Sequence, residues 1–489
     1  MADNTAPPPA EANPPPLDAE ENAQASSGQN VNPWSVSGEV GEDGKVKAID
    51  YGKLTSEFGT TLIDDALLDR FEKVTGHKPH RFMRRQIVFS HRDLSVILDR
   101  YEKNEPFFLY TGRGPSSDSM HVGHTQVFDF VKWLQDVLDV PLIIMLTDDE
   151  KYLFSEKRTI EEVQGYTRTN AMDIIAIGFD PKKTFIFSDF DYVGGAFYRN
   201  IVRFAKRVTY NTAKAIFGFD GSSNIGKIHF ASIQGATAFA TSFPHIFGAD
   251  EKRVAEIPCL IPCAIDQDPY FRLTRDCAAG LHYAKPALIH MRFLDALQGP
   301  GSKMSASDAT SAVFLSDSAK QVKTKINKYA FSGGKETVEE HREKGGDPDV
   351  DVSFQYLQFF MDDDEELSKI RAGYKSGKLL TGELKAICIR YVQDYVTGFQ
   401  ERRSKVTEAT VSEFMSARPL EWKGNAKVPR ADLVVPVSKQ DGAAEGAKGA
   451  EGEGEVSKNT LKKLAKQQQI AQKKAEKEAA KAAKGAEVS

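Results

Sequence analysis

The sequence lacks the features that would place a protein in a membrane or direct it out of the cytoplasm. No apolar run among its 489 residues is long enough to cross a bilayer. The first 44 residues contain no lysine or arginine, which secretory signals and mitochondrial transit peptides both need. We therefore expect a cytoplasmic protein with no membrane partner.

Cysteine is scarce, and it is not arranged as a metal-binding set. The four cysteines are Cys259, Cys263, Cys277 and Cys388. A zinc site would have to combine the first three, but Cys259 and Cys263 lie among Leu, Ile and Pro, and no second close pair follows. We expect reduced, buried thiols.

The two ends of the chain are poor in large apolar residues. Residues 1–30 are polar and proline-rich, a composition typical of disorder. Residues 431–489 form a second low-complexity tail, in which nine lysines oppose three glutamates from Val456 onward. This tail is either a solvated extension or a weak, salt-sensitive contact with RNA phosphates.

Between the tails, the apolar pattern predicts an α/β fold. "PFFLYTG" is a buried strand, a helical stripe of Val127, Val131, Leu134 and Leu138 follows, and "VPLIIML" is a second strand. A strand–helix–strand unit makes a parallel pair, and its ligands bind at the carboxyl ends of the strands.

Further segments extend this pattern into several domains. "KTFIFSDF", "CLIPCAIDQD" and "PALIHMRFL" predict more buried strands. We expect a Rossmann-like parallel-sheet catalytic domain over residues 96–315, with an insertion at about 155–225, and a helical domain over 316–430. Residues 31–95 form a helical and extended segment docked on the catalytic domain. Its last helix is predicted to start near Ser90, a possible N-cap.

A loop after the first strand of this unit, "TGRGPSSDSMHVGH", ends in two histidines. His121 and His124 are three residues apart and share one helix face. They could ligate a metal, bind a phosphate or cap the helix. The loop does not end in the "GK[ST]" of a P-loop, and no third metal ligand is evident, so we expect no metal at the histidines.

The phosphate interpretation uses the backbone as well as the side chains. Gly112, Gly114 and Gly123 allow the chain to approach a ligand closely, and the free amides of a helix N-terminus favour an anion. Arg113 adds a permanent charge. Far downstream, "GSKMSASD" places Lys303 in a Gly/Ser loop, which is either an ordinary surface loop or a cover for a phosphate late in a reaction.

Five motifs in order carry a family resemblance: "YTGRGPSSDSMHVGH", "TDDEKYLF", "CAIDQDPYFRLTRD", "GSKMSASD" and "AFSGGKETVEEHR". The first and fourth resemble the paired signature of class I aminoacyl-tRNA synthetases. Together, the five are similar to the tryptophanyl-tRNA synthetases of the eukaryotic cytoplasm, from about Asn32 to Trp422. The resemblance implies activation of tryptophan with ATP and Mg2+, transfer to tRNA(Trp), and a homodimer whose helical domain binds the anticodon.

The resemblance also implies roles for individual residues. The ATP-binding group comprises Gly112, Arg113, Gly114, His121, Gly123, His124, Lys303, Met304 and Ser305, of which Arg113, His121, His124 and Lys303 are catalytic. Tyr110 would accept the indole N–H, while Glu150, Gln234 and Gln267 would hold the amino group. One departure is Met145, which stands where the human-like members have an indole-reading glutamine.

Other interpretations stay open at this point. Lys335 and Glu336 are either anticodon contacts or part of a solvated turn. A tyrosine-specific synthetase has a similar architecture, a small-substrate nucleotidyltransferase also uses "HxGH", and an RNA-binding protein can descend from a synthetase. The helical domain disfavours the second of these, and intact His121, His124 and Lys303 disfavour the third.

Overall fold

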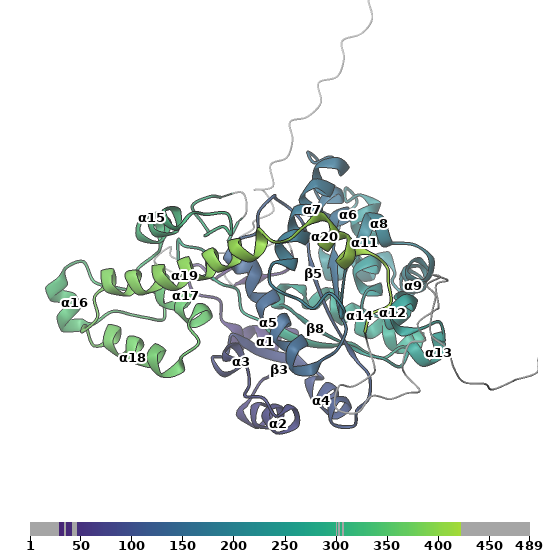
Figure 1. Ribbon diagram of the computed structural model, residues 1–489, viewed down its shortest axis with the longest axis horizontal. Coiled ribbons are helices and arrows are strands. Elements are labelled where there is room, and N and C mark those ends of the chain that lie inside the picture. Colours follow the sequence, from purple (N-terminus) through teal and green to yellow (C-terminus); the bar gives the residue numbers. More distant parts are fainter. Residues whose placement is uncertain are drawn as a thin grey trace, which may run out of the picture. The chain divides into compact units, whose positions relative to one another are not determined.

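A computed structural model describes residues 29–33, 36–41, 46–299, 301, 304–305 and 308–421 (Figure 1). The two predicted tails therefore fall outside the described residues, except for Gln29 and Asn30. In the described part, no helix combines the length and the apolar character needed to cross a membrane.

Seven strands form one central sheet in the order β3-β4-β9-β8-β5-β6-β7. The pairs β9–β8, β8–β5, β5–β6 and β6–β7 are parallel, while β3 and β4 are antiparallel additions at one edge. The strands are β3 (Thr61–Leu62), β4 (Val88–Arg92), β5 (Phe108–Arg113), β6 (Leu142–Leu146), β7 (Thr184–Ser188), β8 (Cys259–Ala264) and β9 (Ala287–Met291). The five strands predicted from the sequence are all present.

The apolar strand sequences fit a parallel sheet that is covered on both faces. Alternate residues of β5 and β6 enter two separate cores: Leu109 and Ile144 pack in one, and Tyr110 and Met145 in the other. Because Tyr110 pairs with Ile143 and Gly112 with Met145 in register, the side chains of Tyr110 and Met145 share one face. The four cysteines are buried and free, as predicted.

The helices that cover the sheet come from its connections. Before β5 they are α1 (Tyr51–Phe58), α2 (Asp65–Thr75), α3 (Arg81–Arg84) and α4 (Leu94–Glu102). The crossovers to β7 use α5 (Val122–Leu138), α6 (Asp148–Leu153) and α7 (Ile160–Ile175). Between β7 and β9 lie α8 (Asp189–Tyr192), α9 (Gly195–Ala205), α10 (Tyr210–Phe217), α11 (Ile225–Ala236), η1 (Ala240–Ser242), α12 (Pro244–Phe247), α13 (Glu251–Val254), η2 (Ile265–Gln267) and α14 (Asp268–Leu281).

The segment before β5 corrects one prediction. Ser90 does not cap a helix; it lies in β4, and α4 begins later, after Asp93. Ser90 is fully buried, and its hydroxyl lies 3.0 Å from Nδ1 of His290 on the neighbouring strand β9. A buried polar partner on β9 therefore accounts for a serine in a strand, and the local sequence gave no sign of it. Further upstream, β1 (Asn30–Val31) and β2 (Val36–Ser37) form a small antiparallel pair.

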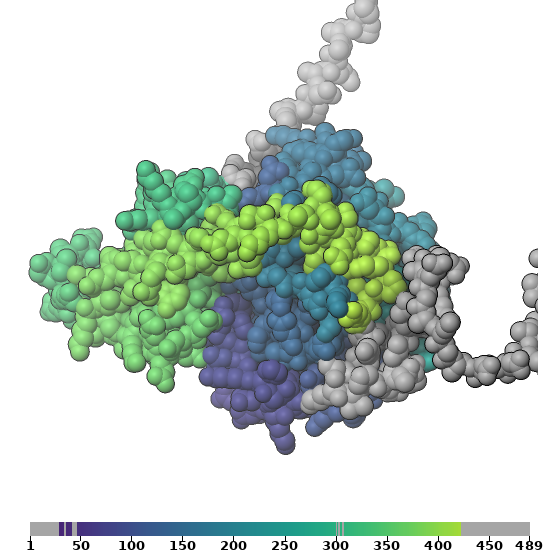
Figure 2. Space-filling view, viewed as in Figure 1, coloured from purple at the N-terminus to yellow at the C-terminus, as the bar shows by residue number. Residues whose placement is uncertain are grey.

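After β9 the chain becomes helical, as predicted. The helices are α15 (Ala319–Tyr329), α16 (Val338–Lys344), α17 (Val352–Phe360), α18 (Asp364–Lys375), α19 (Thr381–Arg403) and α20 (Glu408–Met415). Helix α19 packs on α15 and α17 and continues past them to α7 (Figure 1). In Figure 2 the yellow-green C-terminal part of the described chain runs from the green helical region onto the blue surface. Its Tyr395 donates a 2.7 Å hydrogen bond to Asp129 of α5, so the two regions share a polar contact as well as a core.

A buried ion pair joins the edge strands to α14. Asp268 accepts hydrogen bonds from Arg92 of β4 at 2.7 and 2.9 Å, and it lies 3.0 Å from Nε2 of His290 on β9. Burial alone would raise the pKa of Asp268, but hydrogen bonds from His290 and Arg92 outweigh it and hold the pKa below its usual value. The charged form of Asp268 therefore stabilises the folded state.

We predict that Asp268→Asn lowers the free energy of unfolding by about 3–5 kcal/mol, because Arg92 loses its buried counter-charge. Asp136→Asn is the matched control, since Asp136 pairs with Lys132 on an exposed helix face and should contribute less than about 0.5 kcal/mol. Urea denaturation of each variant at pH 7 checks this. Because the pKa is lowered on folding, the contribution of Asp268 should be present at neutral pH and disappear on acidification below about pH 4. Equal, small effects of the two substitutions would contradict the assignment.

Candidate active site

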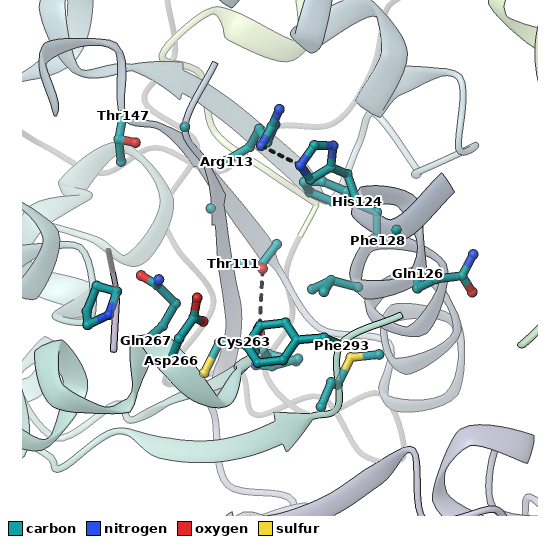
Figure 3. Close-up of a pocket in the computed structure, with 18 of the residues that line it drawn as sticks. Thr111, Arg113, His124, Gln126, Phe128, Thr147, Cys263, Asp266, Gln267 and Phe293 are labelled. Carbon is teal, nitrogen blue, oxygen red and sulfur yellow. Dashed lines mark hydrogen bonds between the residues drawn. The ribbon is translucent and has the colours of Figure 1, made fainter. Parts of the chain in front are cut away.

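One cavity of 310 Å³ lies where β5, β6 and β8 end, and it gathers most of the predicted site (Figure 3). Parallel strands bring their carboxyl ends to the same edge of a sheet, which is why distant motifs meet there. The predicted residues that line it are Tyr110, Gly112, Arg113, Gly114, His121, Gly123, His124, Glu150, Gln234, Gln267 and Met304. Arg113 and His124 face each other on one side of the cavity, and Asp266 and Gln267 lie on the other.

The N-terminus of α5 forms one wall of this cavity. His121 is the N-cap in extended conformation, and its ring stacks on that of His124, with ring centroids 3.5 Å apart. A Cβ on Gly123 would come within 2.9 Å of Sδ of Met304 and 3.2 Å of Nδ1 of His121, so glycine leaves room for both side chains at this turn. The helix therefore presents its free amides beside these two side chains.

His124 has two neighbours within hydrogen-bond distance. Its Nδ1 lies 3.3 Å from the backbone nitrogen of His121, and its Nε2 lies 3.0 Å from Nη1 of Arg113. A neutral imidazole accepts at one ring nitrogen only, so its tautomer decides from which neighbour it accepts. The guanidinium of Arg113 is a permanent donor beside a helix N-terminus, and this arrangement fits a phosphate oxygen better than a metal ion.

Asn170 holds the side chain of Arg113 in place, and one N–H group of the guanidinium has no partner among the described residues. Nε of Arg113 donates to Oδ1 of Asn170 at 3.1 Å, whereas its buried Nη2 has no hydrogen-bond partner among the described residues. Burial lowers the pKa of Arg113 to about 10, although Glu150 and Asp173 oppose the shift. The guanidinium stays charged at neutral pH and is poorly solvated, which is the state that favours binding an anion.

The opposite end of the cavity has groups suited to an ammonium and an aromatic ring. Glu150 accepts from the hydroxyl of Thr147 at 2.7 Å and from Lys151 at 2.8 Å. Nε2 of Gln234 lies 3.4 Å from Oε1 of Gln267. Tyr110 is 2% exposed, and its ring meets that of Phe271 edge to face at 5.7 Å. These residues combine a carboxylate, two amides and an apolar slot.

Three acidic residues lie close together just after the ends of β6 and β7. The side chains of Asp148, Asp149 and Asp189 each have an oxygen within 4.8 Å of the others, a spacing that could hold a cation. Burial, then the neighbouring acids, raises the pKa of Asp189 well above its usual value, and burial raises that of Asp149 to about 6. These shifts make the carboxyl groups easier to protonate, and a bound cation would oppose them. The group does not include His121 or His124.

The remaining predicted residues lie elsewhere. Lys303 is outside the described residues. Ser305 does not line the cavity, and its amide donates to Oγ of Ser311 at 3.1 Å. Lys335 and Glu336 are exposed in the loop before α16 and do not line it either.

Asn170 and Thr147 were not singled out in the sequence. Asn170 lies on α7, 57 positions from the arginine that it holds. Asn170 is not part of a motif, so only the tertiary structure places it. Thr147 begins the "TDDEKYLF" motif, but nothing in the sequence indicated the contact that its hydroxyl makes.

Comparison with known proteins gives a consistent assignment. The family described as tRNA synthetases class I (W and Y) matches residues 102–395. The cytoplasmic tryptophan–tRNA ligase of Schizosaccharomyces pombe is 60% identical over 395 residues, covering 81% of this chain and 99% of the relative. The human cytoplasmic tryptophan–tRNA ligase is 55% identical, covering 80% of this chain and 82% of the relative.

A solved structure agrees. A tryptophanyl-tRNA synthetase from Encephalitozoon cuniculi, crystallised with tryptophan, is 44% identical with a TM-score of 0.70, over 76% of this chain and 98% of that one. The family resemblance is thus confirmed: the chain belongs to the cytoplasmic tryptophan–tRNA ligases, within the class I tRNA synthetases.

Proposed function

We propose that the cavity at the ends of β5, β6 and β8 is where this cytoplasmic tryptophan–tRNA ligase carries out both steps of its reaction. In the first step, the carboxylate of tryptophan attacks the α-phosphate of ATP, giving tryptophanyl-adenylate and pyrophosphate. In the second, a hydroxyl of the terminal adenosine of tRNA(Trp) attacks the activated carbonyl and releases AMP. The observation that carries this proposal is the pairing of an anion-binding helix end with an ammonium- and ring-binding end in one 310 Å³ cavity.

The phosphate end works by orientation and charge, since no side chain need act as a nucleophile. Arg113 and His124, whose side chains lie 3.0 Å apart at the helix end, donate to phosphate oxygens. His121 lies at the same helix end, and the glycines at 112, 114 and 123 let the nucleotide approach the backbone. Binding ATP thus supplies an acceptor for Nη2 of Arg113, which has no hydrogen-bond partner among the described residues.

Magnesium fits this scheme as part of the substrate. The carboxylates among the described residues that line the cavity are Glu150 and Asp266, and Glu150 is already engaged by Thr147 and Lys151. Mg2+ prefers oxygen ligands and is commonly bound through substrate phosphates. It would therefore enter on ATP, where it neutralises phosphate charge.

The amino-acid end binds the two polar groups of tryptophan that do not react, the ammonium group and the indole N–H. Glu150, Gln234 and Gln267 bind the ammonium group, because a carboxylate and amide oxygens are its natural acceptors. The hydroxyl of Tyr110 accepts a hydrogen bond from the indole N–H, which is the only polar group on the ring. Phe271, packed edge to face on Tyr110, supplies part of the apolar slot.

The helical region binds the tRNA in this proposal. Lys335 and Glu336 are exposed in the loop before α16, where they are free to contact anticodon bases. Helix α19 connects this region to α5 through Tyr395, and Nε2 of Gln400 donates to the carbonyl of Leu315 at 2.7 Å, just beyond the "KMSAS" loop. The proposal also includes a homodimer, in which one tRNA contacts both subunits. The lysine-rich tail adds contacts to the tRNA phosphates.

A tyrosine-specific enzyme is the rival within the same fold. We predict that tryptophan supports ATP–pyrophosphate exchange and that tyrosine does so at least about a hundredfold less efficiently, since its smaller ring leaves the slot unfilled. Exchange measured with each amino acid separately, compared as kcat/KM, checks this. Equal exchange with tyrosine would show that the enzyme does not select tryptophan. Exchange without any amino acid would show that it does not activate one.

We predict that Lys303→Ala lowers kcat of exchange about a hundredfold and changes the KM for tryptophan less than about threefold, because its ammonium meets the charge that develops on the leaving pyrophosphate. Lys303→Arg keeps the charge and should retain more of the rate than the alanine variant. Initial-rate kinetics over a range of tryptophan concentrations separates the two parameters. A rise in KM with kcat unchanged would mean that Lys303 contributes ordinary binding.

A further inference from the structure

We propose that Asn170 is a positioning residue for ATP: it fixes the guanidinium of Arg113 and the loop beside it, and so sets the affinity of this chain for the nucleotide. The inference rests on the proposed function and deepens it, because Arg113 belongs to the phosphate end of the cavity. Asn170 itself does not line the cavity, so it acts through the arginine.

The side chain of Asn170 makes three hydrogen bonds. Its Oδ1 accepts from Nε of Arg113 at 3.1 Å. Its Nδ2 donates to the backbone carbonyls of Ser117 at 2.8 Å and of Tyr166 at 2.9 Å. Asn170 is fully buried, and a hydrogen bond in a low-dielectric interior is stronger than one in water. One side chain therefore joins the end of β5, the loop that follows it and α7.

The partners of Asn170 fix the direction of each of these bonds. A guanidinium only donates, so the atom of Asn170 that faces Arg113 is the oxygen. A backbone carbonyl only accepts, so the atom that faces Ser117 and Tyr166 is the nitrogen. Turning the amide over would place donor against donor at Arg113 and oxygen against oxygen at both carbonyls. The site therefore needs an amide, which offers an acceptor and two N–H donors on one short side chain.

The bond to Asn170 leaves the terminal nitrogens of Arg113 for a ligand. Its Nη1 lies 3.0 Å from Nε2 of His124, and its buried Nη2 has no partner among the described residues. Figure 3 shows the guanidinium beside His124 on one side of the cavity. Because Nε is held, the terminal nitrogens are fixed near the helix end before ATP arrives. Such preorganisation lowers the entropy that is lost on binding.

The same asparagine holds the loop on this side of the cavity. Ser117, whose carbonyl it binds, follows Ser116, which lines the cavity. The carbonyl of Ser116 accepts from Nη2 of Arg158 at 3.0 Å. Two successive carbonyls of the loop are thus held by side chains from residues 158 and 170, and Asn170 places the loop and Arg113 together.

Helix α7 gives Asn170 a fixed base. One turn after Asn170, Asp173 accepts from Nε of Arg403 at 2.7 Å. Nε of Arg402 donates to the carbonyl of Ala176 at 2.8 Å. Both arginines belong to the last turn of α19, so the helical region holds α7 while Asn170 reaches the end of β5.

The test separates the affinity for ATP from the affinity for tryptophan. Asn170→Ala removes all three hydrogen bonds. Gln135→Ala is the matched control, since Gln135 is a buried amide that donates to Oγ1 of Thr184 at 3.0 Å and does not line the cavity. Arg113→Ala and the double variant Arg113→Ala with Asn170→Ala complete the set. The KM for each substrate is measured by tryptophan-dependent ATP–pyrophosphate exchange with the full-length proteins.

We expect Asn170→Ala to raise the KM for ATP about tenfold, the size of one lost hydrogen bond to a charged group, and to change the KM for tryptophan less than about twofold. Gln135→Ala should leave both KM values within about twofold. When Arg113 is already alanine, Asn170→Ala should change the KM for ATP less than about twofold, because the group that it positions is gone.

If the alanine variant does not fold, Asn170→Ser is compared in the same way. A helical serine can donate to the carbonyl four residues earlier, here that of Tyr166, but it is too short to reach Arg113. An unchanged KM for ATP, equal rises for ATP and tryptophan, the same rise in Gln135→Ala, or a full tenfold rise in the Arg113→Ala background would overturn the proposal. The proposed function is tested separately by exchange with the unaltered chain and by the effect of Arg113→Ala alone.

Discussion

The parallel pairing of β5 with β6 and β8 is the constraint on which the site depends. It brings three strand ends to one edge of the sheet, so that residues from positions 110 to 304 line a single cavity. The pairing also fixes which side chains share a face: Tyr110 and Met145 point into the same core because their strands are in register. A slip of either strand by one residue would turn its side chains to the opposite face and separate the two.

The cavity contains a polar group that lacks a partner in the free protein. The guanidinium of Arg113 lies against His124, and its Nη2 is buried without a partner among the described residues. An unmet donor of this kind costs stability. In our proposal an anion supplies its acceptor, so the site binds phosphate without a P-loop. Gly123 leaves room for the Met304 side chain beside the first turn of α5.

Much of this could be predicted from the sequence, because the relevant signals are local. Buried strands of a parallel sheet are continuous apolar runs, and the glycine loop and paired histidines mark a helix N-terminus that lines the cavity. Ser90 and Asn170 could not be predicted. Each is a small polar residue whose role depends on a partner distant in the chain: His290 and Arg113, respectively. The acidic group around Asp189 was missed for the same reason, since two of its members follow β6 and the third follows β7.

The same distinction applies to specificity. The motifs identify the chemistry and include Tyr110, whereas Met145, whose sulfur lies 3.3 Å from the Tyr110 hydroxyl, lies outside them. The most direct measurement is a crystal structure with a non-hydrolysable analogue of tryptophanyl-adenylate. The account predicts the phosphate analogue between Arg113 and His124 at the start of α5, and the indole nitrogen within hydrogen-bond distance of the Tyr110 hydroxyl. A phosphate group away from α5, or an indole nitrogen facing a different residue, would contradict it.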